Sequence, residues 1–287
     1  MAVALLASAE EFLLQTTQFR AADPYRTNLI GSVATSVAVG SATYENYFWW
    51  VVTDLQGHVI GVAMRTAPHG MVLSPMPEEA RRELAKSVAI QDDNFPDVAG
   101  PVTVVNSFIG AYAHTGSTGS SRQTEIEGRQ LLYALNELRI PNIQGAMVDA
   151  LADDFDLLLE WYLEFGTEAK IMMPNPSASV RSGLQRNGFR FWVVDGEKVC
   201  LAGHAPIVET PSGSVGRVGP VYTPAIHRKN GYGSALTARL SQELLDMDAM
   251  VMLYTDASNP TSNGIYQRIG FELIDENVKV NFLARNV

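Results

Sequence analysis

The stretch that decides the fold is residues 221–234, which read Val-Tyr-Thr-Pro-Ala-Ile-His-Arg-Lys-Asn-Gly-Tyr-Gly-Ser. An extended run, residues 215–223, ends at Pro224, and a basic loop with Gly231 and Gly233 leads directly into a helical pattern. Glycines let successive backbone N–H groups turn toward one point, and a helix N-terminus adds partial positive charge there. The stretch therefore predicts a binding site for a phosphate or a pyrophosphate.

Two familiar phosphate-binding loops do not fit this stretch. The sequence contains no Gly-x-x-x-x-Gly-Lys-Ser/Thr string, and Leu236 stands where a dinucleotide fingerprint needs its third glycine. The residues from Arg228 to Gly233 instead read Arg-x-x-Gly-x-Gly. This string resembles the pyrophosphate loop of the GNAT superfamily of acyl-CoA-dependent N-acyltransferases.

A second motif follows at residues 256–271, which read Asp-Ala-Ser-Asn-Pro-Thr-Ser-Asn-Gly-Ile-Tyr-Gln-Arg-Ile-Gly-Phe. It resembles the second GNAT hallmark, Asn-x-x-Ser-x-x-x-Tyr-x-x-x-Gly-Phe. The matching residues are Asn259, Ser262, Tyr266, Gly270 and Phe271. The resemblance covers roughly residues 144–287. It implies an α/β (α+β) fold, with a mixed, mostly antiparallel twisted sheet flanked by helices.

The residues of this second motif predict a short helix without reference to any family. Asn259 is a good N-cap, and Pro260 suits the first helical position. The helix is expected to run to about Arg268, because Gly270 then favours a stop.

A break near Ile140-Pro141-Asn142 separates two predicted helices, at residues 124–139 and 150–165, whose apolar residues recur at helical spacing. We therefore expect two domains, residues 1–143 and residues 144–287. In the second, the pattern predicts a helix at 180–187 and strands at 189–195, 198–208, 214–223, 250–255, 271–274 and 278–283.

The first half repeats this order weakly. It has predicted strands at 47–53 and 58–66 and a predicted helix at 77–89, so it resembles an eroded, degenerate GNAT-like unit in a tandem. It contains neither the Arg-x-x-Gly-x-Gly string nor the Asn…Tyr…Gly-Phe string, and residues 116–121 are interpreted as a loop. We expect one CoA site, in the second half.

Composition excludes several classes of function. The net charge is −10, and each half is acidic, with 9 basic against 14 acidic side chains in residues 1–143 and 12 against 17 in residues 144–287. Sequence-independent nucleic-acid binding needs a basic face, so no nucleic-acid partner is expected. No apolar run reaches the length of a membrane span, and residues 1–10 are interpreted as the start of a helix.

The single cysteine and the scattered histidines complete this picture. Cys200 excludes an internal disulfide and fits a reducing cytoplasm; its apolar surroundings, residues 199–202, predict a core residue. The five histidines show no metal-ligand spacing, so no metal is expected. The expected state is a monomer or a homodimer, and the expected partner is a small-molecule amine acceptor.

The resemblance implies a role for each residue of the two motifs. In GNAT folds the backbone of the matching strand, here Val221 and Thr223 with Tyr222 between them, holds the thioester and the pantetheine. The N–H groups of the loop would hold the pyrophosphate, from Lys229, Asn230, Gly231, Tyr232, Gly233 and Ser234. The side chains of Arg228 and Lys229 either add charge or are simply solvated.

The remaining roles stay open at this level. Asn259, followed by Ser262, either binds the pantetheine or orders the helix entry. Tyr266 is either the general acid at the thioester sulfur or a half-buried aromatic filling the groove. The general-base candidates are His204, Glu209 and His227.

The resemblance predicts an N-acetyltransferase that moves an acetyl group from acetyl-CoA to an unidentified primary amine, by direct attack in a ternary complex. Two alternatives remain: a non-catalytic acyl-CoA-binding sensor, and an interaction protein that uses the surface of the first half.

Overall fold

The computed structural model describes residues 1–171, 173 and 175–283, and the chain divides into two compact units. Unit 1 contains Met1–Leu132, Thr210–Ser212 and the described residues from Asp275 onward; unit 2 contains Tyr133–Glu209 and Gly213–Ile274. The division therefore falls at residues 132–133 instead of 143–144. The C-terminal segment also groups with the first unit.

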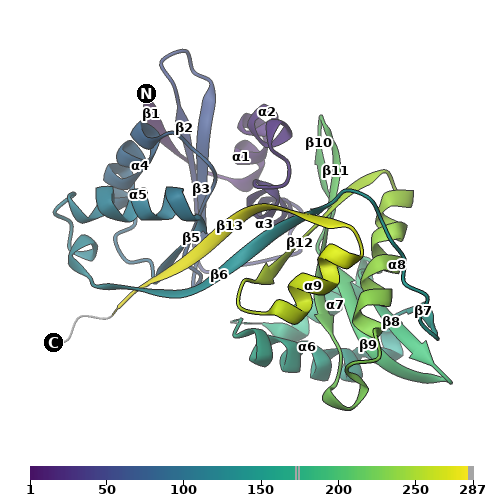
Figure 1. Cartoon of the computed structure of the whole chain (residues 1–287). Helices are drawn as coiled ribbons and strands as arrows, with labels where there is room; N and C mark the ends of the chain where they lie inside the picture. Colours follow the sequence, from purple (N-terminus) through teal and green to yellow (C-terminus); the bar gives the residue numbers. More distant parts are fainter. Residues whose placement is uncertain (172, 174, 284–287) are drawn as a thin grey trace. The chain divides into compact units, whose positions relative to one another are not determined.

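Unit 1 is a sheet with helices on both faces (Figure 1). Its strands follow the order β1-β2-β3-β4-β5-β13, and all neighbours are antiparallel except the parallel pair β4 and β5. The strands are β1 (Ala2–Leu6), β2 (Tyr47–Thr53), β3 (Val59–Thr66), β4 (Met71–Leu73), β5 (Asp97–Pro101) and the end of β13 (Phe271–Phe282). The helices are α1 (Ala9–Gln15), α2 (Thr17–Ala22), α3 (Asn28–Ala38), α4 (Glu78–Gln91) and α5 (Val102–Ala113), with a 3-10 turn at Gly119–Ser121.

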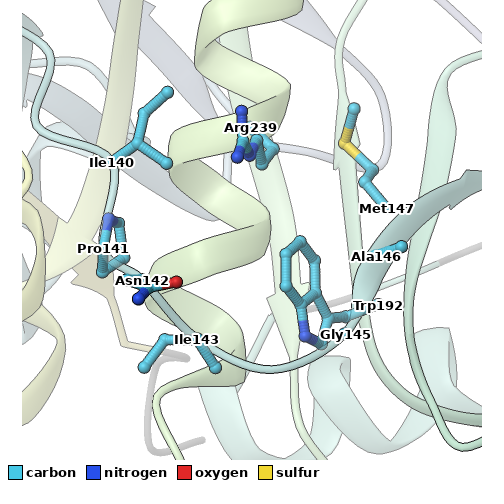
Figure 2. A pocket seen from close by; sticks show the side chains of 9 residues that line it. All are labelled: Ile140, Pro141, Asn142, Ile143, Gly145, Ala146, Met147, Trp192 and Arg239. Atoms are coloured by element: carbon cyan, nitrogen blue, oxygen red, sulfur yellow. The ribbon is translucent and has the colours of Figure 1, made fainter.

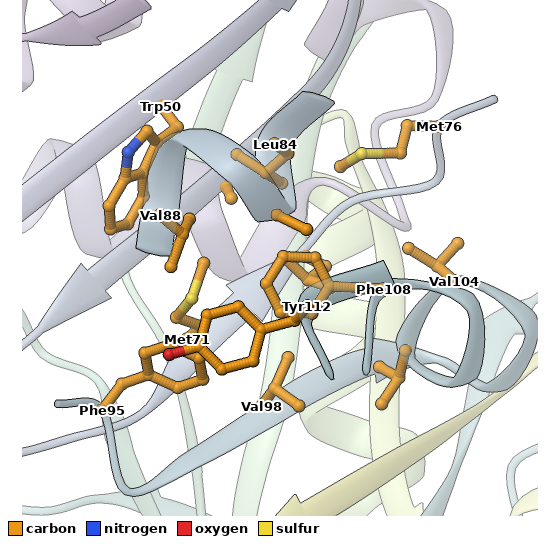
Figure 3. Packing of buried hydrophobic residues seen from close by; sticks show 14 of the residues in the cluster. Trp50, Met71, Met76, Leu84, Val88, Phe95, Val98, Val104, Phe108 and Tyr112 are labelled. Atoms are coloured by element: carbon orange, nitrogen blue, oxygen red, sulfur yellow. The ribbon is translucent and has the colours of Figure 1, made fainter. Parts of the chain in front are cut away.

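The continuous apolar run of β2 is explained by burial on both faces. Trp49 and Val51 pack with α1 and α3, whereas Trp50 and Val52 pack with α4 and α5. Figure 3 shows the second of these clusters, in which Trp50 lies with apolar side chains of α4 and α5. A strand in this position needs no polar face, so its sequence shows no alternation.

Unit 2 repeats the same plan. Its strand order is β12-β11-β9-β8-β7, with β10 paired to β11; β11 and β12 are parallel, and the other neighbours on this path are antiparallel. The strands are β7 (Ala146–Asp149), β8 (Phe189–Val194), β9 (Glu197–His204), β10 (Val208–Thr210), β11 (Gly213–Tyr222) and β12 (Ala249–Asp256). The helices are α6 (Phe155–Ala169), α7 (Pro176–Gln185), α8 (Tyr232–Asp246) and α9 (Pro260–Arg268), with 3-10 turns at Ala152–Asp154 and Ala225–His227.

The two faces of the unit 2 sheet are covered by different helices. Leu158 and Trp161 of α6 and Val180 of α7 pack with Phe191 and Leu201 of the sheet on one face. Helix α8 buries its apolar side, which includes Leu236, Leu240 and Leu244, and it contacts β8, β9, β11 and β12. In both units a helix joins the parallel pair, α4 between β4 and β5 and α8 between β11 and β12.

The helix predicted over residues 124–139 is wrong, because this segment forms strand β6 (Thr124–Leu135). Leu132 and Tyr133 are both fully buried although they are adjacent, and Ile126 of the supposed apolar stripe is 55% exposed. Gly128 also disfavours a helix interior. The strand runs across the division between the units at residues 132–133, which is why the expected boundary lay too far along the chain.

Two smaller expectations also need correction. Residues 1–10 do not simply begin a helix: β1 comes first, and α1 starts after Ser8, whose Oγ accepts a hydrogen bond from the Glu11 N–H. A short apolar run does not by itself distinguish a strand from a helix. The two predicted closing strands are one continuous strand, β13, and its second half pairs with β5. No helix among the described residues combines the length and apolar character needed to cross a membrane.

Candidate functional site

The loop before α8 places a helix N-terminus with free backbone donors. Lys229 and Gly231 have left-handed backbone conformations, with φ of 68° and 83°, and Gly231 is the N-cap of α8. The N–H of Ala235 donates to the Gly231 carbonyl at 3.0 Å. The N–H groups of residues 232–234 have no hydrogen-bond partner within the described chain, as expected of a first helical turn. They form a cradle suited to an anion.

This cradle lies beside the end of β11. A Cβ atom built on Gly233 would lie 3.5 Å from the Thr223 Oγ1 and 3.8 Å from a Val221 methyl carbon. The glycine therefore keeps the space between the helix start and the strand end clear of a side chain. Whatever binds the N–H groups of the cradle also reaches the end of β11.

Strands β11 and β12 separate before the end of β11 is reached. Their parallel register runs from Ser214 opposite Ala249 to Val218 opposite Leu253 and ends there within the described chain. Beyond this point β11 stays paired with β9, after an irregularity that follows Val218. The last residues of β11 therefore have no partner in β12 within the described chain, and they lie beside the cradle.

Tyr266 supplies a protonated phenol to this region. The residue as a whole is only half-buried, but its hydroxyl end is enclosed, and burial raises its pKa to about 12 with a further contribution from the Cys200 thiol. Its ring meets Phe271 edge to face at 6.1 Å between centroids. At neutral pH the phenol is a proton donor, which is the state a general acid requires.

Cys200 is confirmed as a core residue. It is fully buried on β9, and burial raises the pKa of its thiol to about 12. The Thr223 hydroxyl donates to its Sγ at 3.2 Å. A nucleophilic cysteine is a thiolate, so this side chain is unsuited to forming an acyl-enzyme at neutral pH.

Two side chains of the loop before α8, Arg228 and Asn230, form hydrogen bonds that stabilise the loop. The Arg228 guanidinium donates to the Thr223 carbonyl at 2.8 Å and to Glu168 at 2.6 Å, and Glu168 raises its pKa. The Asn230 amide donates to the carbonyls of His227 and Arg228. Lys229 is exposed and makes no ion pair among the described residues. Arg228 therefore holds the loop, and Lys229 is the cation that remains solvated.

Asn259 caps α9, which is the second of its two predicted roles, ordering the helix entry. Its Oδ1 accepts the Ser262 N–H at 3.0 Å, and Pro260 occupies the first helical turn. Tyr222 offers only its backbone to the site, because its side chain is buried against α6, with its ring 6.3 Å from that of Trp161.

The three candidate bases lie in structural contacts. His204 is buried, burial lowers its pKa below the ordinary value, and its Nδ1 lies 2.8 Å from the Ala205 carbonyl oxygen. Glu209 accepts a hydrogen bond from the Ser214 hydroxyl, and His227 lies 3.5 Å from Glu197. His204 lies opposite Val218, the last residue of β11 in register with β12, whereas Glu209 contacts the start of β11 and His227 contacts the start of β9.

Comparisons with known proteins agree with this geometry. Residues 204–280 match the family model described as FR47-like protein. The chain is similar to a GCN5-related N-acetyltransferase from Sphaerobacter thermophilus, with 14% identity, a TM-score of 0.64 and coverage of 100% of this chain and 96% of that one. It is also similar to an acetyltransferase of the GNAT family from Colwellia psychrerythraea, with 11% identity, a TM-score of 0.61 and coverage of 99% and 100%.

A third similar structure is a tandem GNAT protein from the clavulanic acid biosynthesis pathway, with 12% identity, a TM-score of 0.60 and full coverage of both chains. The chain has the GNAT fold, in two tandem units. A search of curated proteins gives no match.

The first GNAT unit differs from the second at the place of the cradle. Between β4 and α4 the chain reads Ser-Pro-Met-Pro, without a glycine, and Glu78 and Glu79 occupy the first helical turn. Met76 is buried against Gly61, where an added Cβ would lie 2.6 Å from the Met76 Cβ. Two carboxylates at a helix N-terminus disfavour an anionic ligand there.

A recess of about 570 Å³ lies next to the cradle of unit 2 (Figure 2). Ile143 belongs to its lining, and its Cδ1 lies 2.9 Å from the position of a Cβ on Gly231. Arg239 of α8 is the charged residue among the described residues that line it. Local sequence patterns could not predict this contact, because Ile143 and Gly231 are far apart in the chain.

Arg217 is a charged residue close to the point where β11 and β12 separate. It lies in β11, inside the apolar run of residues 215–218, and a lone charge in a buried strand was the signal that could have found it. Among the described residues there is no group of three or more acidic, histidine or cysteine side chains that could hold a metal ion.

Proposed function

We propose that unit 2 is an N-acetyltransferase that uses acetyl-CoA and a primary amine. One observation carries the proposal: the free N–H groups of α8 lie beside the end of β11, the segment of this strand that has already separated from β12. This arrangement offers an anion site and an open strand edge side by side. A molecule with a pyrophosphate at one end and a thioester on a long arm fits both.

The residues present fit acetyl-CoA as a substrate. The N–H groups of residues 232–234 would bind the pyrophosphate, and the pantetheine arm would follow the end of β11. The Asn263 amide donates to the carbonyls of Asp256 and Ala257, which fixes its orientation. Its Oδ1 is buried without a partner in the described chain, and we assign it to an amide N–H of the arm.

The transfer needs few groups from the protein. The neutral amine nitrogen forms a bond to the thioester carbonyl carbon, the carbon–sulfur bond breaks, and the amine loses a proton to solvent. The Tyr266 phenol is protonated at neutral pH, so it can give its proton to the leaving thiolate and later recover one from water. The buried Cys200 thiol supports direct transfer rather than an acyl-enzyme.

The test combines binding with turnover. Calorimetry should show one acetyl-CoA bound per chain, and thiol release across a library of primary amines should exceed the rate without protein. A chain that binds acetyl-CoA but releases no thiol with any amine would be an acyl-CoA sensor. A chain that binds no acetyl-CoA would refute the proposal.

A further inference from the structure

Arg217 lies on the face of the unit 2 sheet opposite α8. A Cβ on Gly216 would meet the Leu244 side chain of α8 at 3.0 Å, so position 216 faces that helix. Successive strand residues point to opposite faces, and Arg217 therefore points to the face covered by α6 and α7. Burial lowers the pKa of Arg217, and Tyr254 of β12 and Tyr162 of α6 oppose this shift, which agrees with this placement.

A second arginine shares these surroundings. Arg186 follows α7, its Nη2 donates to the His204 carbonyl at 2.6 Å, and its Nε is buried with no partner in the described chain. Burial lowers its pKa, and the positive charge of Arg217 lowers it further, while Tyr162 acts on both arginines. The Arg186 guanidinium is bound to the His204 carbonyl, and the N–H of the adjacent Ala205 donates to the Arg217 carbonyl at 2.9 Å, so the two arginines are neighbours. Burial lowers the pKa of both, and a bound anion would oppose this effect.

Arg217, Arg186, Tyr162 and Tyr254 form what we call the arginine cluster. Two of its members, Arg217 and Tyr254, lie where β11 and β12 separate. Arg217 directly precedes Val218, the last residue of β11 in register with β12, and Tyr254 directly follows its partner Leu253. The cradle lies on the α8 side of the same opening, because Gly233 of α8 is beside the end of β11. A second substrate that reaches the thioester from the other face would pass Arg217 and Tyr254.

We infer that Arg217 and Arg186, with the phenols of Tyr162 and Tyr254, bind an anionic group on the amine acceptor. The acceptor is then an amine that also carries a carboxylate or a phosphate. This inference rests on the proposed function. The chain as a whole has a net charge of −10 and repels anions, so preference for an anionic acceptor must come from local cations such as these.

The experiment compares matched acceptors on the full chain with acetyl-CoA. The carboxylate arm uses glycine, β-alanine and γ-aminobutyrate against their amides. The phosphate arm uses O-phosphoethanolamine against ethanolamine. In either the carboxylate or the phosphate arm, kcat/KM for the anionic amine should exceed kcat/KM for its neutral counterpart by about 10- to 100-fold. We call this quotient the anion preference; its size is that expected of one charge-assisted hydrogen bond.

Three variants separate binding from folding. Arg217→Gln should raise KM for the anionic amine and so remove most of its advantage in kcat/KM over the neutral amine, whereas Arg217→Lys should keep part of this advantage. Arg181→Gln is the matched control: Arg181 lies on α7 and stacks on the Phe155 ring at 4.5 Å, so the same charge is lost away from the cluster. Arg181→Gln should leave the anion preference unchanged, and all three should bind acetyl-CoA as the wild type does.

The outcomes are distinct. If the neutral amines are acetylated with the same kcat/KM as the anionic amines of both classes, the inference is overturned and the proposed function stays intact. An anion preference that survives in Arg217→Gln would also overturn the inference. Failure to bind acetyl-CoA, or binding without transfer to any amine, would overturn the proposed function and this inference together.

Discussion

Gly231 connects the backbone geometry of the loop to its proposed ligand, so Gly231→Ala tests that link. The residue has φ of 83°, a conformation that costs an L-amino acid about 1–2 kcal/mol. The added Cβ would also lie 2.9 Å from the Ile143 Cδ1 and 3.3 Å from its Cγ1. These atoms belong to the end of a flexible side chain, so Ile143 yields by a small shift. We expect the free energy of unfolding to fall by about 1–2 kcal/mol.

Gly196→Ala is the matched control for backbone strain. Gly196 lies in the turn between β8 and β9 of the same unit, has φ of 84°, and an added Cβ would meet nothing within 4 Å. It should lose a similar free energy of unfolding, measured by urea denaturation. Its acetyl-CoA affinity should stay at the wild-type level.

The affinity of Gly231→Ala should fall by about 10- to 100-fold in calorimetry. A hydrogen bond from one N–H group to a charged phosphate contributes about 1.5–3 kcal/mol, and the strained residue turns at least one donor away. If Gly231→Ala and Gly196→Ala bind acetyl-CoA equally well, the loop is not the phosphate site and the reasoning from its backbone fails.

Three further predictions concern the same unit. Tyr266→Phe should lower kcat by roughly 100-fold or more while acetyl-CoA affinity stays constant, and an unchanged rate in the thiol-release assay would remove the general acid. Asn259→Ala should lower the free energy of unfolding by about 1 kcal/mol, because the hydrogen bond from the Ser262 N–H to the cap is lost. Asn259→Ser should keep both the stability and the acetyl-CoA affinity. A loss of affinity in Asn259→Ser would show that the Asn259 amide binds the ligand. Burial raises the pKa of Cys200 from 9.0 in the unfolded chain to about 12, so the folded state keeps a proton that the unfolded state releases. The contribution of Cys200 to stability should therefore be constant below pH 9 and decrease above it by up to about 1.4 kcal/mol per pH unit, a decrease that Cys200→Ala should remove in urea titrations at pH 8 to 10.

The site was predictable where local backbone chemistry decides the structure. A helix N-terminus leaves its first N–H groups free, and the glycine before α8, Gly231, can take the left-handed conformation that it has in the structure. The cap at Asn259 is similarly local, since a side chain two or three residues away from its partner needs no knowledge of the fold. The sequence could not decide whether Arg228 faces a ligand, because its partner Glu168 is 60 residues away.

The fold was harder to predict where long-range pairing overrides local pattern. Residues 124–135 have apolar positions at helical spacing, but Leu132 and Tyr133 are buried side by side in a strand. The second half of β13 pairs with β5, at a separation of more than 170 residues, and local patterns carry no information about such a partner. The expected boundary at residues 143–144 followed from the helix expected at residues 124–139, and the observed division falls at residues 132–133 inside β6.

A crystal structure of the chain with acetyl-CoA tests the central claim most directly. We predict one molecule per chain, with pyrophosphate oxygens within about 2.7–3.2 Å of the backbone nitrogens of residues 232–234. The thioester should lie between β11 and β12, with Tyr266 at its sulfur. A pyrophosphate bound away from the start of α8, or a second molecule bound at α4 of unit 1, would contradict the account.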